Sequence, residues 1–401
     1  MRRLLAALVA ALACAACSAD PTGPVTVLAL AFDPSDLHYH LSEVQLRSLT
    51  SVSSMSGDVT SLVGAATLVV DPQALAAQGV TTADEFKRAV TQSPGGPVTF
   101  LYAQSGGVLY PEDFDSLNEA TTYYNFEKAF DYFASLGLTH QDLAPYPVYY
   151  FPDFRRPNAS GALTQAKDNA LFYPALKAFL VLPFDQLQAL PLSMNLGVVA
   201  HEYTHAVTNA KLYQADSLPW PFQHDSSDPE WATVKHLLRS VDEGLADYFG
   251  ANAVGDPRYL EHSLGHDESG PRDLAAQHCA TPAMAAELPG AHDDLYDPYP
   301  LGSVLGGALW RTGQVVNDRQ AIAEDVFGAL VPLGIALQQA STSVDAALVV
   351  ETLAAGIRAS ARPVACGLLL DRFAGLGVTR DRVPSCAKST APMPTCASAG
   401  P

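Results

Sequence analysis

Apolar residues recur along this chain with two different periods, and the change between them separates a mixed half from a helical half. Short strand-like runs rich in Val, Phe and Tyr occupy residues 25–32, 68–70, 98–102, 148–151 and 179–183. Helical spacing begins at residues 81–90, with Thr81 or Thr82 as the N-cap, and returns as an aromatic stripe over residues 118–137. The pattern predicts an α+β protein whose aromatic helix belongs to the core.

The second half of the chain has helical spacing almost throughout. Apolar positions recur with a 3.6-residue period over residues 321–331, 333–340, 343–357 and 367–373. Pro332 falls between the first two segments, so we expect the helix to break or kink there. The pattern predicts a mainly α-helical C-terminal lobe, followed after residue 384 by an irregular tail rich in Pro, Ser and Ala.

The apolar helix at residues 198–207 carries His201, Glu202 and His205 in an H-E-x-x-H pattern. The two histidines are one helical turn apart, so both imidazoles leave the same face and can share one ion. Two neutral imidazoles suit Zn²⁺, and the glutamate can take a proton from water at that metal. The competing interpretation is a chance match on a core helix.

A second helical pattern, residues 241–250, places Glu243 and Asp247 four positions apart and ends at Gly250. An oxygen of Glu243 would complete a His₂Glu ligand set and leave the fourth position for water. Asp247, one turn further on, can accept the second ring N–H of a liganding histidine. The alternative is an amphipathic helix with two solvated acids.

These two segments resemble the motifs of thermolysin-like zinc metallopeptidases, the gluzincins, and of the related fungalysins: HEYTHAVTN at 201–209 and EGLADYFG at 243–250. The resemblance implies a two-lobe fold, in which a mixed sheet and the H-E-x-x-H helix meet a helical lobe at the metal site. It implies these roles: zinc ligands His201, His205 and Glu243, general base Glu202, and histidine partner Asp247. The 37 residues between the second histidine and the liganding glutamate exceed the usual separation, and we expect residues 219–235 to form a surface loop near the cleft.

The resemblance also bears on the substrate side of the cleft. Asn169 and Ala170 match a sheet edge that binds the substrate's main chain in thermolysin-like enzymes, although an ordinary turn is the alternative. The oxyanion of the transition state needs a donor beyond zinc. Tyr299 stands near the position where gluzincins often carry a histidine, and Tyr213 and His292 are the other candidates; a structural role is the alternative for each.

Composition narrows the class of partner. The chain has 401 residues, 48% of them apolar and 16% charged, which fits a folded protein of two or more domains. Its net charge of −19 argues against nucleic acid and against anionic membrane surfaces as partners. We therefore expect a peptide or protein substrate and membrane contact only through an N-terminal lipid.

Residues 1–17 resemble a bacterial lipoprotein signal. Arg2 and Arg3 form a basic start, a short apolar run follows, and Cys17 comes directly after two alanines. Lipidation of Cys17 would anchor the exported protein to the cell envelope. Two alternatives stay open: lipidation of Cys14, and secretion after cleavage near Ala16.

Four cysteines outside the signal allow up to two disulfides in an oxidising compartment: Cys279, Cys366, Cys386 and Cys396. Their connectivity stays open, and three of them fall in the last forty residues, which suggests a stapled tail. The expected division is a β-rich or mixed region over 18–96 (with a pro-segment as an alternative), a catalytic N-lobe over 97–250, a helical C-lobe over 251–384 and a tail over 385–401.

Together the patterns and the resemblance predict an exported metalloendopeptidase with one catalytic Zn²⁺. A non-catalytic zinc-containing envelope lipoprotein with a binding role is the main alternative, and a zinc hydrolase acting on non-peptide substrates is another. Calcium also stays open, because acidic clusters at residues 225–228 and 293–294 could bind it, with solvated loops as the simpler interpretation.

Overall fold

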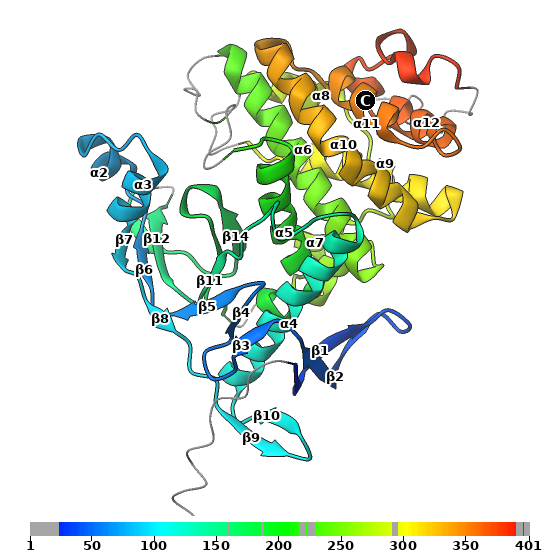
Figure 1. Ribbon diagram of the computed structural model, residues 1–401. Coiled ribbons are helices and arrows are strands. Elements are labelled where there is room, and N and C mark those ends of the chain that lie inside the picture. The colour runs from blue at the N-terminus through cyan, green and yellow to red at the C-terminus, as the bar shows by residue number, and fades with distance from the viewer. Residues whose placement is uncertain are drawn as a thin grey trace, which may run out of the picture.

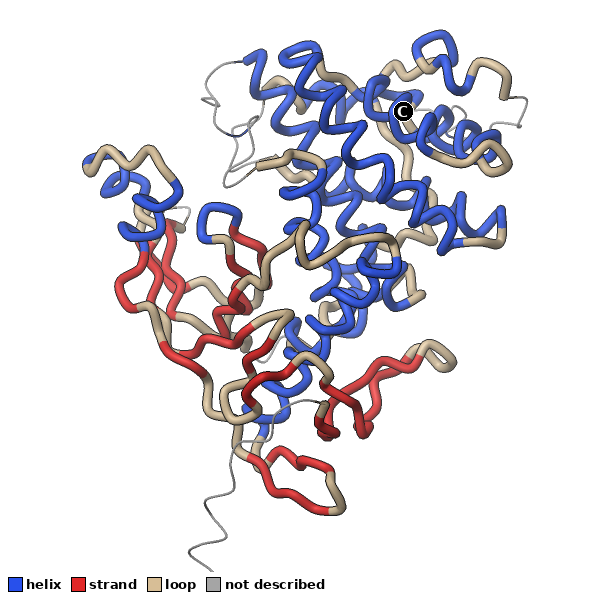
Figure 2. Tube along the Cα trace, viewed as in Figure 1, coloured by secondary structure: helices blue, strands red, loops and turns tan. Residues whose placement is uncertain are grey.

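Strands gather in the N-terminal part of the chain and helices in the C-terminal part, so the predicted α+β class is confirmed (Figures 1 and 2). The computed structural model describes residues 24–158, 160–185, 188–215, 222, 229–290, 296–389 and 396. The expected signal at residues 1–17, with Cys17, lies outside the described residues.

A seven-stranded mixed sheet forms the floor of the β-rich part. Its strand order ends in β14, β15 and β11, with β15 parallel to β11 and antiparallel to β14. The other end of the sheet comes from the first hundred residues. Its strands are β14 (Ala170–Tyr173), β15 (Ala178–Val181), β11 (Pro147–Tyr150), β5 (Ser61–Gly64), β4 (Ser56–Gly57), β3 (Leu49–Ser51) and β8 (Gly96–Pro97). Strand β14 therefore lies at an edge, as predicted for the residues after Asn169.

Two four-stranded sheets flank this floor. The first is β2 (His38–Leu46), β1 (Val25–Asp33), β10 (Val108–Pro111) and β9 (Tyr102–Ser105). The second is β13 (Leu163–Gln165), β12 (Asp153–Pro157), β6 (Thr67–Val69) and β7 (Thr91–Ser93). Beside it lie α2 (Pro72–Ala77) and α3 (Ala83–Val90). Of the two N-cap candidates for α3, Thr82 is the cap, and it forms a capping box with Glu85.

Of the strand expected at residues 98–102, only Tyr102 is in a strand, as the first residue of β9, and the prediction is wrong for residues 98–101. Val98 and Phe100 are buried and their neighbours are exposed, so the segment has the alternation of a strand. It runs, however, from β8 in one sheet to β9 in another, and these residues pair with neither ladder. Periodicity reports which side chains are buried, and it does not report whether a partner strand lies alongside.

Seven long helices build most of the rest of the described chain, with two short ones, α7 (His266–Ser269) and α8 (Pro282–Glu287), between α6 and α9. The long helices are α4 (Phe114–Ser135), α5 (Leu196–Lys211), α6 (Pro229–Val254), α9 (Tyr299–Val316), α10 (Arg319–Ala340), α11 (Ala346–Gly356) and α12 (Arg362–Arg372). The aromatic stripe of α4 joins the sheet to the helices. The Phe126 ring lies 4.8 Å from Phe179 of β15, and the Phe133 ring stacks 5.7 Å from Tyr203 of α5. The stripe is core, as predicted.

Two helix boundaries differ from expectation. Residues 229–235 are the first turns of α6 and not part of a loop, because Pro229 is tolerated in a first helical turn and Val234 continues into the buried face. Pro332 does not interrupt α10. It leaves the carbonyl of Gly328, four positions earlier, without a partner, but both residues are exposed and this carbonyl can bind water.

By length and composition α10 could cross a membrane, but just over half of its apolar window is buried inside the fold, as in a core helix.

Two disulfides pair the four cysteines: Cys279 with Cys396, and Cys366 with Cys386. The first links residues separated by 117 positions and the second holds α12 to the turn that follows it. The expected stapling of the C-terminal part is confirmed.

Glu119 of α4 generates a prediction about stability. It is 6% exposed, its Oε2 has no hydrogen-bond partner in the described chain, and burial together with Asp115 and Asp113 raises its pKa to about 7. Because the folded pKa exceeds the unfolded value, the native state binds the proton more tightly. The free energy of unfolding should therefore fall as pH rises from about 4.5 to about 7, by up to about 3 kcal/mol before solvent screening reduces it.

Denaturant titrations of wild type and Glu119→Gln at pH 5 and pH 8 measure this effect, and the variant should gain stability relative to wild type only at pH 8. The control is Glu85→Gln, because the capping hydrogen bonds lower the pKa of Glu85 to about 2. A depressed carboxyl pKa stabilises the native state above the unfolded pKa, so Glu85→Gln should lose stability at pH 8. A parallel response of both variants would contradict the assignment.

Candidate metal centre

Helices α5 and α6 lie against each other at glycines, and this close approach brings their polar residues together. A Cβ added to Gly250 of α6 would lie 2.7 Å from the carbonyl oxygen of Gly197 in α5. On the other side of α6, a Cβ on Gly244 would lie 2.5 Å from the carbonyl oxygen of Gly302 in α9. Any side chain at these positions would push the three helices apart. The glycines thus set the spacing on which the site depends.

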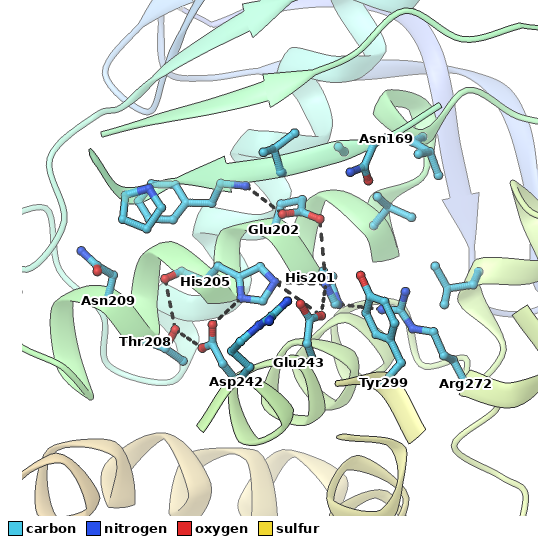
Figure 3. A pocket seen from close by; sticks show the side chains of 18 of the residues that line it. Asn169, His201, Glu202, His205, Thr208, Asn209, Asp242, Glu243, Arg272 and Tyr299 are labelled. Atoms are coloured by element: carbon cyan, nitrogen blue, oxygen red, sulfur yellow. Dashed lines mark hydrogen bonds and ion pairs between the residues drawn. The ribbon is translucent and has the colours of Figure 1, made fainter. Parts of the chain in front are cut away.

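Three side-chain atoms converge between the two helices (Figure 3). The Nε2 atoms of His201 and His205 lie 3.2 Å apart, and Oε2 of Glu243 lies 3.3 Å from the first and 3.8 Å from the second. A tetrahedral Zn²⁺ with ligand bonds of about 2.0–2.1 Å holds its ligands roughly 3.3–3.4 Å apart. The triangle therefore has the dimensions of a zinc ligand set before any ion is considered.

The remaining ring nitrogens decide which tautomer each histidine adopts. Nδ1 of His201 lies 3.0 Å from Asp247, and Nδ1 of His205 lies 2.8 Å from Asp242. Each carboxylate holds the ring proton at Nδ1, which leaves both Nε2 lone pairs facing each other. Oε2 of Glu243 is buried and accepts no hydrogen bond of good geometry from the described residues. Three acceptors aimed at one point fit a metal cation.

The electrostatics of the cluster favour added positive charge. Burial alone would lower the pKa of His205, but the carboxylates of Asp242 and Glu243 outweigh it and raise that pKa to about 10. The pKa of His201 rises in the same direction, against its burial, because of Asp247 and Glu243. Burial would raise the pKa of Glu243, yet the two imidazoles hold it below its usual value. A divalent cation would supply the charge that these groups otherwise draw from protons.

Glu202 lies beside the three converging atoms without being one of them. One of its oxygens is 3.9 Å from Nε2 of His201, and the other accepts the backbone N–H of Phe172 at 2.9 Å. Burial raises the pKa of this carboxyl despite the nearby histidines. Phe172 belongs to the edge strand β14, so the carboxylate stands between the ligands and the strand that faces the cleft.

Three partners of the site were not predicted from the sequence: Asp242, Tyr259 and Arg272. The Tyr259 hydroxyl donates to Asp247 at 2.7 Å and lies 3.2 Å from Nδ1 of His201. Arg272 donates to the same carboxylate from two nitrogens and lies 4.1 Å over the Tyr299 ring. Tyr259 and Arg272 come from short 3₁₀ turns without periodicity, so only the tertiary fold reveals them. Asp242 carried one signal, its place directly before Glu243.

The other predicted residues fall in different places. Tyr299 begins α9, is 36% exposed, and lines the same cavity as the ligands, where the Glu243 carboxylate raises the pKa of its hydroxyl. Tyr213 also lines this cavity but is buried, and its hydroxyl lies 3.5 Å from the carbonyl of Leu238, so it donates to the backbone of α6. His292 and the acidic clusters considered for calcium lie outside the described residues. Only Tyr299 of these tyrosines has its hydroxyl available to a substrate.

Asn169 and Ala170 line this cavity, which has a volume of about 460 Å³ (Figure 3). Asn169 accepts the N–H of Leu182 through its backbone carbonyl, at 2.9 Å. Aliphatic side chains also contribute to the lining: Leu192, Val198, Leu260 and Leu264. The cavity therefore combines a strand edge, the histidine and glutamate side chains of α5 and α6, and an apolar wall, a lining that could accept a segment of polypeptide.

No family model matches this chain, and a search of the curated proteins finds no match to it. The chemistry of the protein must therefore be argued from the geometry of the site.

Asp242 provides a test of the centre itself. Because it fixes the tautomer of a liganding histidine, Asp242→Asn should weaken zinc binding by about 10- to 100-fold. The measurement is competition between the purified protein and a chromophoric chelator. Asp325→Asn is the matched control, since Asp325 is on α10 and pairs with Arg358, away from the three converging residues. Equal zinc affinity in the two variants would show that Asp242 does not support the metal centre.

Proposed function

We propose that this protein is an exported zinc metalloendopeptidase of the thermolysin-like, gluzincin type, anchored to a bacterial envelope through Cys17. One observation carries the proposal: two histidines and a glutamate converge at zinc-ligand spacing while Glu202 stands beside them, bonded to a strand edge. A purely structural zinc site has no use for a non-liganding buried carboxylate at that place.

The arrangement of elements supports the thermolysin-like part of the proposal. Helix α5 lies beneath the edge of a mixed sheet, α6 brings the third ligand, and α9 to α12 form a helical lobe beyond it (Figure 1). The two disulfides support export, because such bonds persist in oxidising compartments. These features agree with the resemblance of the two motifs.

His201, His205 and Glu243 would hold the zinc ion, which when bound would supply a Lewis acid for the peptide carbonyl and lower the pKa of a water molecule at the site. The protein supplies the proton transfer. Glu202 takes the proton of the attacking water and returns it to the leaving amine, and its raised pKa suits a group that must both accept and release a proton. The Phe172 N–H holds one oxygen of this carboxylate and leaves the other facing the ligands.

The substrate is held by the edge of β14. The N–H of Phe172 points away from β15 toward Glu202, and backbone groups of residues two apart in a strand point the same way. The N–H and C=O of Ala170 therefore face the cleft, where they can pair with an extended peptide. This pairing favours a peptidase over an esterase, because an ester lacks the N–H that such a ladder uses.

The developing oxyanion requires a donor, and Tyr299 is the residue placed to provide it. Its ring lies under the Arg272 guanidinium, which is itself held by Asp247. The stacking fixes the ring on the cavity wall beside the ligands. The tyrosine O–H thereby takes the part that a histidine often has in gluzincins.

Glu202→Gln separates the peptidase from a non-catalytic zinc protein. Wild type and variant should both bind about one zinc, whereas hydrolysis of casein should fall by at least about 100-fold in the variant because the general base is lost. Glu119→Gln serves as the control, since it removes a buried carboxylate elsewhere. Wild-type protein that binds zinc and cleaves no casein would favour the non-catalytic alternative. Wild-type protein that binds no zinc would contradict the proposal. Cleavage of esters but not of peptide libraries would favour a different zinc hydrolase.

Tyr299→Phe tests the oxyanion donor. Removal of one such donor should lower kcat by about 100-fold or more while KM changes little, because the interaction forms only in the transition state. Tyr213→Phe is the matched control, since its hydroxyl is directed at the Leu238 carbonyl. Steady-state kinetics on one peptide substrate compare the two. Equal kcat values in both variants would assign the oxyanion to another group.

A further inference from the structure

The N-terminal hairpin of β1 and β2 reaches the start of the helix that carries the histidines. Tyr39 of β2 accepts the N–H of Leu196 at 2.8 Å and donates its hydroxyl to Oδ1 of Asn195 at 2.9 Å. Leu196 is the first residue of α5 and Asn195 is its N-cap. The first turn of a helix has N–H groups without intrahelical partners, and here a distant tyrosine satisfies one of them.

Asn195 connects this cap to the residues around the ligands. Its Oδ1 also accepts the N–H of Gly197 at 3.0 Å, and its amide donates to the carbonyl of Tyr259 at 2.8 Å. The Tyr259 hydroxyl is bonded to Asp247 and lies 3.2 Å from Nδ1 of His201. A continuous set of hydrogen bonds thus runs from the hairpin to a ligand and to the carboxylate that orients it.

Tyr39 is itself held by its neighbours. Its ring packs edge-on against Phe32 across the hairpin, with centroids 5.1 Å apart, and against His262 at 5.4 Å. His262 belongs to the same 3₁₀ turn as Tyr259 and lies 3.0 Å from Asp256. The hydroxyl is therefore directed at α5 from a ring that has little freedom to turn.

The rest of the N-terminal region is joined to the catalytic unit in a similar way. The buried carboxylate of Glu127 in α4 accepts the N–H groups of Arg47 and Ser48 and the Ser48 hydroxyl. Strand β5 lies between β4 and β11 in the central sheet, and β6 pairs with β12. Removal of residues 25–97 would expose an edge on each of three strands, β10, β11 and β12, and this carboxylate, which a detachable pro-segment would not do.

We infer that the β1–β2 hairpin is a permanent part of the site and that Tyr39 is a positioning residue for α5. The inference rests on the proposed function where it concerns zinc and turnover, while the helix cap can be measured without either. Loss of the hydroxyl leaves the Leu196 N–H open to water and loosens the first turn of the helix whose second and third turns carry the ligands.

The test compares Tyr39→Phe with wild type and with Tyr123→Phe, all in the full chain. Tyr123 is the matched control because its buried hydroxyl bonds only to Ser48 in the hydrogen bonds of the described residues. Tyr39→Phe should speed amide exchange at Leu196 about tenfold. It should also release zinc to a chelator several-fold faster and lower kcat while KM stays the same. Tyr123→Phe should leave amide exchange, zinc release and kcat unchanged. In a separate measurement, the intact mass of the active protein should show that it retains residues 25–46.

Equal exchange at Leu196 in the two variants overturns the cap, whatever the zinc content. Faster exchange with unchanged zinc release and kcat overturns the positioning role, and so does an active protein that lacks the hairpin. Wild type without zinc overturns the proposed function instead, and exchange at Leu196 then decides for or against the cap alone.

Discussion

The structure depends on one electrostatic constraint, the convergence of three electron-pair donors on a point between α5 and α6. Two imidazole lone pairs and a carboxylate oxygen repel one another in a buried place unless a cation or protons lie between them. Everything around them preserves that convergence. Gly250 keeps the two helices close, Asp242 and Asp247 hold the ring protons on the far nitrogens, and the cap at Asn195 fixes the start of α5.

Around this point, groups of opposite charge lie one behind the other: the histidines, then the aspartates, then Arg272. The ligands face the metal position, aspartates stand behind the histidines, and Arg272 stands behind Asp247. The fold stabilises a buried anion by pairing it on one side with a guanidinium and on the other with an imidazole, so the pKa of Asp247 is held well below its usual range. The same guanidinium covers Tyr299, which ties the orientation of His201 to the wall of the cavity.

The sequence was sufficient for what periodicity and motif spacing encode, and insufficient for what tertiary approach creates. His201, Glu202, His205 and Glu243 were expected together and lie together, because each is fixed by a helical register. Arg272 and Tyr259 could not be expected, since they lie in turns that only the packed fold brings to Asp247. The same limit explains two errors in the fold. The segment at 98–101 has the alternation of a strand without a partner, and Pro332 continues a helix because the Gly328 carbonyl that it leaves without a partner is open to water.

The residues that form and support the centre come from distant parts of the chain, from Tyr39 on the hairpin to Tyr299 on α9. The three converging residues come from only two helices, the histidines from α5 and the glutamate from α6, but their orientation needs the hairpin, the turn at Tyr259 and the turn at Arg272 in place. A site assembled in this way cannot exist in the unfolded chain, so a metal ion bound there would stabilise the folded state. The hairpin then has a thermodynamic reason to stay with the helical body: without it, the repulsion between the converging donors would act on a helix whose first N–H, that of Leu196, has lost its partner.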